Sequence, residues 1–446
     1  MRSLEVRMTM FRARARIAVL ALAAMAAASS TTLGQDLSGV ERRIVEHVDA
    51  HAEEAIAFLE QLVNVNSGTM NHEGVQQVSR LFAPRLEALG FSVRWIEMPP
   101  EVNRAGHLFA ERRGDKGRKI LLIGHLDTVF EEDSPFQRFE REGNTAWGPG
   151  VDDMKGGDIV MLYALEALHA AGALEGTSIT VALTGDEESP GHPIEISRGD
   201  LIQAGIEADV ALGFEGGVGS ANSATVARRG SSGWTLTVSG TRGHSSGIFS
   251  EDFGSGAVFE VARILNGFHE SVRGEQYLTF NPGVILGGTD VQYDPANTRG
   301  AAFGKTNVIA QTAVVDGGLR FISEEQKERA RAAMREVVAR HLPGTSAKID
   351  FDDSYPAMPP TEGNRHLFEM FDAASRDLGL GGIDAVDPGA RGAADISFVA
   401  PHADGLAGLG VFGDGSHTAE ESIELGSLRT ATLRAALLIH RLTRGD

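Results

Sequence analysis

Three apolar runs in this chain each lead into a side chain that can bind a metal ion. The runs, with the residues that follow them, are 121–124 with His125, 178–184 with Glu187 and Glu188, and 209–214 with Glu215. Such runs indicate buried strands, and parallel strands end at the edge of an α/β sheet where ligands bind. A charged residue after one strand more often begins a solvated loop. Three strand ends that all carry His or Glu predict a common metal site.

The first of these runs carries a second polar residue, Asp127, two positions after His125. Side chains alternate along extended chain, so both residues point the same way. This arrangement suits an imidazole that binds a metal through one ring nitrogen while a carboxylate holds the other. Taken alone, His125 fits equally well as a core histidine with a hydrogen-bond partner.

The composition restricts what such a site can contain. The chain has no cysteine, which excludes disulfides, thiolate metal ligands and a cysteine nucleophile. Its formal net charge of -20 argues against nucleic acid as the main partner. With 446 residues and 42% hydrophobic content, the chain can form one large or two moderate domains.

The N-terminal segment, residues 1–34, differs from everything that follows. Arginines precede an apolar stretch at residues 17–28, and small and polar residues come next. This layout is typical of a secretory signal peptide. No later run reaches the ~20 apolar residues that a transmembrane helix needs. We therefore expect a secreted or periplasmic protein that is free of the membrane after cleavage.

The hydrophobic pattern predicts an α/β domain with a second domain inserted into it. Helical periods cover residues 40–63, 73–89 and 158–171, and they resume at 365–378 and 427–441. Between them, alternation begins at about residue 224 and opens a β-α-β-β-α-β order, which is that of a ferredoxin-like sandwich. We predict an α/β domain from residues 35–223 and 353–446, and an inserted α+β domain at 224–352.

Five short motifs then carry a resemblance to a known family. They are residues 124–128 (GHLDT), 148–156 (GPGVDDMKG), 184–188 (TGDEE), 214–215 (FE) and 415–418 (GSHT). In this order and spacing they resemble the signature set of the co-catalytic di-zinc peptidases. That family includes aminoacylases, acetylornithine deacetylases, succinyl-diaminopimelate desuccinylases and bacterial glutamate carboxypeptidases. The resemblance implies a zinc-peptidase-like mixed sheet flanked by helices, with the inserted domain as a lid and homodimerisation module.

The resemblance also implies a role for each motif residue. Asp153 would bridge two zinc ions, with cobalt or manganese as alternatives. The other implied ligands are His125 with Glu215 for one ion, and Glu188 with His417 for the other. Glu187 would be the general base, and Asp127 would orient His125. Two cations that share a carboxylate can activate both a water and an amide carbonyl.

The inserted domain contributes two further candidates. Residues 243–246 (GHSS) resemble the lid motif whose histidine, here His244, reaches across a dimer to the carbonyl oxygen under attack. Two serines stand where small residues are usual in that motif. Asn307 resembles the lid asparagine that helps to hold the substrate.

Arg391 is our candidate for binding a free α-carboxylate, because a guanidinium can hold a carboxylate through two hydrogen bonds. The alternative is a structural arginine that pairs with Asp387 or Asp395. Arg320 is open to the same two interpretations.

Three functions are compatible with this pattern. The first is an exported zinc carboxypeptidase or amidohydrolase that cuts an amide next to a free carboxylate, as glutamate carboxypeptidases do. The second is an N-acyl-amino-acid deacylase or a dipeptidase of the same family. The third is a metal-free binding relative. Every implied ligand and the base are present, and such costly clusters of carboxylates mark a functional site, so we expect an enzyme.

Overall fold

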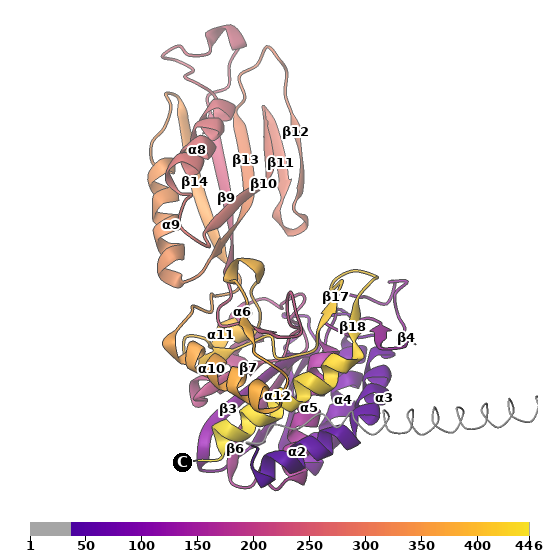
Figure 1. The fold of residues 1–446 in the computed structure, drawn as a ribbon. Coiled ribbons are helices and arrows are strands. Elements are labelled where there is room, and N and C mark those ends of the chain that lie inside the picture. The colour runs from indigo at the N-terminus through magenta and orange to yellow at the C-terminus, as the bar shows by residue number, and fades with distance from the viewer. Residues whose placement is uncertain (1–36, 446) are drawn as a thin grey trace, which may run out of the picture.

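The computed structural model describes residues 37–445 and divides them into two bodies joined by a narrow connection (Figure 1). The predicted signal peptide, residues 1–34, lies outside the described residues. Within the described part, no helix has the length and apolar character required to cross a membrane.

The lower body in Figure 1 is built on a six-stranded mixed sheet. Its strands, in spatial order, are β1 (Ser92–Glu97), β2 (Gly106–Arg112), β6 (Thr177–Thr184), β3 (Lys116–His125), β7 (Val210–Gly213) and β16 (Asp404–Leu406). The strands β6, β3, β7 and β16 are parallel to one another, whereas β2 pairs antiparallel with both β6 and β1. The three predicted apolar strands are thus neighbours, and their carboxyl ends lie at one edge of the sheet.

Both faces of this sheet are buried, which explains why its central strands are apolar without a polar alternate face. Leu122 belongs to one core and its neighbours Leu121 and Ile123 belong to another. The helices that contribute buried residues to the first core are α2 (Gly39–Ala50), α3 (Ala52–Val63), α4 (His72–Ala88), α5 (Lys155–Ala170), α10 (Glu362–Asp377) and α12 (Leu425–Thr443). Those beside the second are α6 (Ile194–Ser197), α7 (Gly199–Glu207) and α11 (Ile396–Val399).

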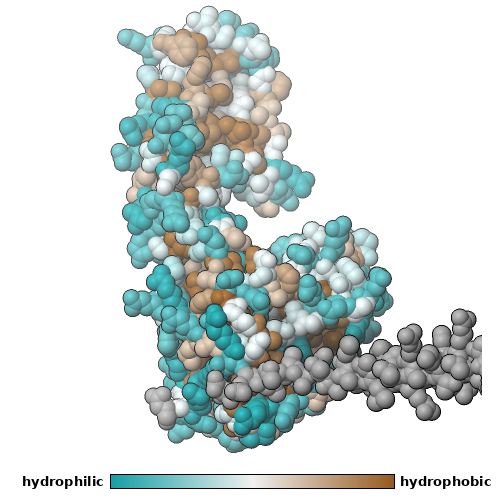
Figure 2. All heavy atoms as spheres, in the orientation of Figure 1, coloured by the Kyte–Doolittle hydropathy of each residue, from teal (hydrophilic) through white to brown (hydrophobic). Residues whose placement is uncertain are grey.

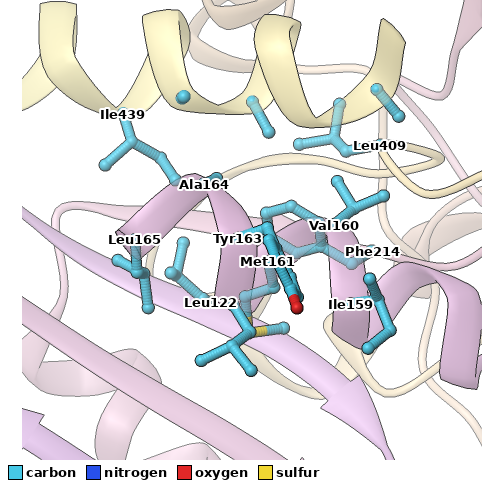
Figure 3. Close-up of a cluster of buried hydrophobic side chains, with 14 of the residues drawn as sticks. Leu122, Ile159, Val160, Met161, Tyr163, Ala164, Leu165, Phe214, Leu409 and Ile439 are labelled. Atoms are coloured by element: carbon cyan, nitrogen blue, oxygen red, sulfur yellow. The ribbon is translucent and has the colours of Figure 1, made fainter. Parts of the chain in front are cut away.

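Helix α5 begins near the predicted site and is largely enclosed by other elements. Figure 3 shows it between β3 and α12, with Leu122 on one side and Ile439 on the other. Thirteen of its sixteen residues are buried, so its sequence is apolar on all sides, as expected of a core helix. This packing fixes the start of α5 at Lys155, two residues after Asp153.

One predicted helix is wrong in its extent. The helical period at residues 40–63 predicts a single helix, but the structure contains α2 and α3, which are separated at His51. The break falls in residues 49–54, none of which is buried, so the hydrophobic pattern is silent there. Hydrophobic periodicity therefore cannot detect the change in direction.

The upper body, residues 230–353, packs two helices on a four-stranded antiparallel sheet. Its elements in chain order are β9 (Gly230–Gly240), α8 (Ala257–Ser271), β10 (Thr279–Gly288), β13 (Thr312–Phe321), α9 (Glu324–Val338) and β14 (Thr345–Asp353). The spatial strand order is β10-β13-β9-β14, and Trp234, Leu236 and Val238 of β9 enter the core. A hairpin that the sequence pattern did not indicate, β11 (Asp290–Asp294) with β12 (Arg299–Phe303), follows β10.

Two short segments, residues 228–231 and 354–358, connect the bodies, and we call them the hinge segments. They run side by side, because Arg228 and Met358 exchange two backbone hydrogen bonds of 2.9 and 3.0 Å. The amide of Ser231 also donates to the carbonyl of Tyr355 at 2.8 Å. The hinge segments therefore form one paired ribbon between the two bodies.

Candidate metal centre

The predicted ligands converge at the carboxyl edge of the sheet. His125 is the last residue of β3, and Glu188 and Glu215 follow the ends of β6 and β7 by a few residues. Asp153 lies in the turn before α5. Parallel pairing of β3 with both β6 and β7 therefore brings residues from distant parts of the chain to one place.

His417 reaches the same place through a small second sheet. It lies in the loop between β17 (Gly413–Asp414) and β18 (Ser422–Glu424), and β18 pairs with β5 (Thr145–Trp147) just before the loop of Asp153. Its backbone φ is 67°, in the left-handed region that non-glycine residues rarely adopt. Strain of this kind is concentrated at binding and catalytic sites.

Asp153 lies between the two histidines and contacts each with a different oxygen. His125 Nε2 is 3.2 Å from Asp153 Oδ1, and His417 Nε2 is 3.1 Å from Asp153 Oδ2. His417 Nε2 is also 3.1 Å from Glu188 Oε2. Ligands on a tetrahedral zinc with bonds of about 2.0 Å stand roughly 3.3 Å apart. The donor atoms of His125, Asp153 and Glu188 all lie within 4.8 Å of one another, close enough to hold a metal ion, and His417 adjoins them through Asp153 and Glu188.

The charges at this centre depend strongly on one another. Burial disfavours the ionised form of Asp153, but hydrogen bonds with His125 and His417 outweigh it and hold its pKa well below the ordinary value. Hydrogen bonds with Asp153 and Glu188 raise the pKa of His417 to about 10. Burial raises the pKa of Glu188 to about 7. Burial, together with the nearby charge of Glu215, raises the pKa of Glu187 well above its ordinary value.

Asp127 connects the histidine strand to the two glutamates. Its Oδ1 accepts from the amide of Glu187 at 3.0 Å, and its Oδ2 accepts from the amide of Glu188 at 3.1 Å and from the hydroxyl of Thr69 at 2.7 Å. The same carboxylate lies 3.4 Å from Nδ1 of His125. Asp127 is fully buried, so these contacts fix the position of His125 relative to both glutamates.

Glu421 is a structural residue of this centre that sequence reasoning missed. Its carboxylate accepts hydrogen bonds from the amides of Gly150, Asp152 and Asp153 at 3.1, 2.9 and 3.0 Å. Burial raises its pKa to about 8. In the sequence it stands beside Glu420 and has the pattern of a solvated acidic pair, so no local signal distinguishes it.

Glu215 differs from the other predicted ligands because two arginines hold it. Its Oε2 lies 2.6 Å from Nη1 of Arg228 and 3.1 Å from Nη2 of Arg391. Neither Asp387 nor Asp395 is the ion-pair partner of Arg391 among the described residues. Asp395 instead binds Arg198 at 2.7 Å. Arg228, in the first hinge segment, is a second residue that the sequence analysis missed.

A cleft of about 210 Å³ opens beside the centre, and Arg391 contributes the cation in its lining. Asp153 and Glu215 line the same cleft, together with the glycine-rich segments 216–219 and 413–416. The Nε of Arg391 is buried and has no hydrogen-bond partner in the described part of the chain. Burial and the neighbouring Arg228 lower the pKa of Arg391 to about 10, so it remains charged at neutral pH.

The two candidates of the upper body lie next to each other but apart from these contacts. His244 pairs with Val308 through the backbone, and the amide of Ser245 donates to the carbonyl of Asn307 at 2.9 Å. Both candidate side chains are exposed. Within residues 37–445, neither forms a hydrogen bond or ion pair with the predicted metal ligands. Arg320 lies on β13 of the upper body and is not part of the centre.

Comparison with known proteins gives consistent results. A family model described as peptidase family M20/M25/M40 matches residues 121–441. Carboxypeptidase G2 from Pseudomonas sp. (strain RS-16) is 25% identical over 435 residues, covering 96% of this chain and 98% of that protein. Succinyl-diaminopimelate desuccinylase from Gluconobacter oxydans (strain 621H) is 26% identical over 396 residues, covering 84% and 94%.

A solved structure shares the fold. The Bacillus subtilis YXEP protein, described as a dinuclear metal binding peptidase from the M20 family, aligns with a TM-score of 0.61 at 13% identity. The alignment covers 89% of this chain and 100% of that one.

Proposed function

Because the chain belongs to peptidase family M20/M25/M40, we propose that it is an exported zinc hydrolase that cleaves an amide bond next to a free carboxylate. Its family makes it a metallopeptidase or a related amide hydrolase. Within this family, the similarity to carboxypeptidase G2 over 96% of the chain supports a carboxypeptidase-like reaction. Export rests on the arginine-rich and apolar pattern of residues 1–34.

Two zinc ions would be held by Asp153 between them, with cobalt or manganese as alternatives. The remaining ligands would be His125 and Glu215 for one ion, and Glu188 and His417 for the other. Arg228 and Arg391 both bind Oε2 of Glu215, and among the described residues no hydrogen bond to Oε1 is found, so Oε1 would be available for a cation. Such ions supply a Lewis acid for the amide carbonyl and lower the pKa of a water.

Glu187 is the proposed general base. It accepts a proton from the attacking water and returns it to the nitrogen of the leaving amine. Asp127 accepts from the amide of Glu187 and contacts His125, so it fixes the position of the base relative to that histidine.

The observation that carries the substrate assignment is the position of Arg391 in the cleft beside Asp153. A guanidinium can bind a substrate carboxylate, and the amide to be cut would then lie over the metal ligands. The desuccinylase relative favours a second candidate within the family, an N-acyl-amino-acid deacylase or a dipeptidase. Both candidates retain a free carboxylate near the reacting amide.

A homodimer is part of the same proposal, with residues 224–352 as the lid and dimerisation domain. Large apolar side chains are exposed on the upper body, and Figure 2 shows apolar side chains at its surface. The large exposed apolar residues of the upper body are Phe249, Val258, Phe259, Ile285 and Phe303. Exposed apolar groups of this size favour a protein interface. Across such a dimer, His244 of the partner would approach the carbonyl oxygen, and Asn307 would contact the substrate.

Substrate screening tests the proposal. Apo-protein reconstituted with zinc is assayed against N-acylglutamates, α- and γ-linked glutamate dipeptides, and the same compounds with the carboxylate converted to a carboxamide. We expect hydrolysis of the free acids and at least a tenfold lower kcat/KM for the carboxamides, because the Arg391 contact is lost. Equal rates on both sets would refute the carboxypeptidase-like reaction. No hydrolysis by zinc-loaded protein would favour a metal-free binding role.

A further inference from the structure

The second hinge segment places a tyrosine hydroxyl on the loop of the proposed base. Tyr355 lies two residues beyond the end of β14, and its Oη donates to the backbone carbonyl of Glu187 at 2.9 Å. Its ring packs against Phe398 of α11, with ring centroids 4.9 Å apart. The side chain therefore extends from the hinge into the lower body and ends at Glu187.

The peptide groups on both sides of Glu187 are held as a result. Its N–H donates to Oδ1 of Asp127 at 3.0 Å, and its carbonyl accepts from Tyr355 at 2.9 Å. The first contact connects the base to the metal centre and the second connects it to the hinge. With both contacts made, the Cα of Glu187 is fixed, and the carboxylate is directed from a defined position.

The surroundings of Tyr355 are rigid and suit a hydroxyl donor. Arg198 is completely buried beside it and bridges Asp186 at 2.5 Å and Asp395 at 2.7 Å. Asp186 directly precedes Glu187, so the bridge also supports the loop of the base. Burial and nearby carboxylates raise the pKa of Tyr355 above its ordinary value, so the hydroxyl keeps its proton.

The first hinge segment makes a similar contact with another residue of the site. Arg228 binds Oε2 of Glu215 at 2.6 Å, and its other guanidinium nitrogens donate to the carbonyls of Gly392 and Ala393 at 2.8 and 3.2 Å. Each hinge segment thus holds one residue of the proposed machinery. The two hinge segments therefore support the site together, Arg228 through Glu215 and Tyr355 through Glu187.

We propose that Tyr355 is a positioning residue for the reaction: from the hinge, it fixes the backbone of Glu187 so that the base is aligned with the attacking water. The inference rests on the proposed function, in which Glu187 is the base. Small displacements of a catalytic group reduce turnover strongly while leaving substrate binding intact. Tyr355 therefore acts on kcat rather than on KM.

The test compares Tyr355→Phe with Tyr277→Phe. The first variant keeps the ring against Phe398 and removes only the hydroxyl. The second is a matched control, because the hydroxyl of Tyr277 also crosses between the bodies, to Asp387 at 3.3 Å, but does not contact the site. For the zinc-loaded enzyme acting on its best N-acylglutamate, we expect Tyr355→Phe to lower kcat about tenfold with KM and zinc content within about twofold. Tyr277→Phe should match the wild type.

Hydrogen exchange of the zinc-free protein gives a second readout that does not depend on activity. We expect the peptide that contains residues 185–189 to exchange faster in Tyr355→Phe than in Tyr277→Phe, because one of the two contacts on Glu187 is lost. A kcat within twofold of the control, or unchanged exchange at residues 185–189, would overturn the inference. Loss of zinc or of thermal stability together with activity would also overturn it, since the role would then be structural.

A double variant separates this inference from the proposed function. If Tyr355 acts through Glu187, Tyr355→Phe should have no further effect on the residual kcat of Glu187→Gln, whereas additive losses would show an independent role. Full activity of Glu187→Gln would refute the proposed base, and the inference with it. An impaired Glu187→Gln beside an unimpaired Tyr355→Phe would refute the inference alone.

Discussion

The two bodies hold their candidate residues in opposite ways. In the lower body, His125 and Asp127 are 2% and 0% exposed, and each contacts at least one other candidate. In the upper body, His244 and Asn307 are exposed, and their described contacts are with their own neighbours. The candidate metal ligands are therefore brought together within one chain. His244 and Asn307 can contribute to that site only if a partner chain or a movement of the upper body brings them close to it.

The difference follows from the cost of burying charge. A buried carboxylate needs hydrogen bonds or an opposite charge, and the buried Asp127 and Glu421 each accept at least two hydrogen bonds, as does the partly exposed Asp153. An exposed imidazole such as that of His244 needs no such support. Substitutions in the lower body should therefore disturb the metal centre itself, and substitutions in the upper body should leave it intact.

The largest expected effect is that of Asp153→Ala. Because Asp153 contacts both histidines, we expect the variant to lose both metal ions and all measurable activity. His417→Ala or Glu215→Ala should each lose mainly one ion, since each removes a ligand from one site. Metal analysis of the three dialysed proteins measures this. Equal losses in all three would contradict a shared carboxylate.

Glu187→Gln should have the next largest effect and should separate chemistry from metal binding. We expect kcat to fall by about 10²–10⁴-fold while both ions and KM are retained, because only proton transfer is removed. Glu195→Gln, an exposed change on α6, is the control. Loss of metal from Glu187→Gln would mean that Glu187 and Glu188 have exchanged roles.

His244→Ala tests the upper-body side of the comparison. If its imidazole stabilises the oxyanion, kcat should fall by about 10²–10³-fold. Zinc content and dimerisation should match the wild type, since the structure places His244 outside the contacts of the metal ligands. Loss of zinc in this variant would break the proposed separation between the bodies.

Arg391→Met should have the smallest effect of the four and should depend on the substrate. We expect kcat/KM to fall by about 10–100-fold on substrates with a free carboxylate, the range for losing a hydrogen bond to a charged group. On the matching carboxamides it should change little, and Arg391→Lys should be intermediate. Equal loss on both substrate sets would assign Arg391 to holding Glu215 alone.

Much of the fold and of the metal centre follows from local sequence pattern. The runs that became β3, β6 and β7 are short and apolar, and parallel strands must place their following residues at one edge. For this reason the sequence alone predicts that His125, Glu188 and Glu215 lie in one region, and the parallel pairing of the three strands brings them there. The alternation in β9 likewise predicts a half-buried antiparallel strand, and Trp234 is buried as expected.

Residues that act through distant backbone contacts could not be predicted in this way. Glu421 holds the amide of Asp153 across 268 residues of sequence, and Tyr355 reaches Glu187 across 168. Neither position differs in composition or period from an ordinary loop residue. Arg228 presents the same problem, since it stands beside Arg229 and only the packing of the hinge segments directs it to Glu215. These partners are determined by tertiary packing.

Mixing two inactive variants tests the central claim that the metal centre is complete in one chain while His244 acts on the partner's centre. Asp153→Ala retains His244 but lacks the metal centre, and His244→Ala retains the metal centre. After subunit exchange, each heterodimer should combine one intact metal centre with one intact His244 in trans, so we expect partial recovery of activity. If the mixture stays inactive although heterodimers are shown to form, or if active wild-type enzyme is monomeric, the claim is wrong.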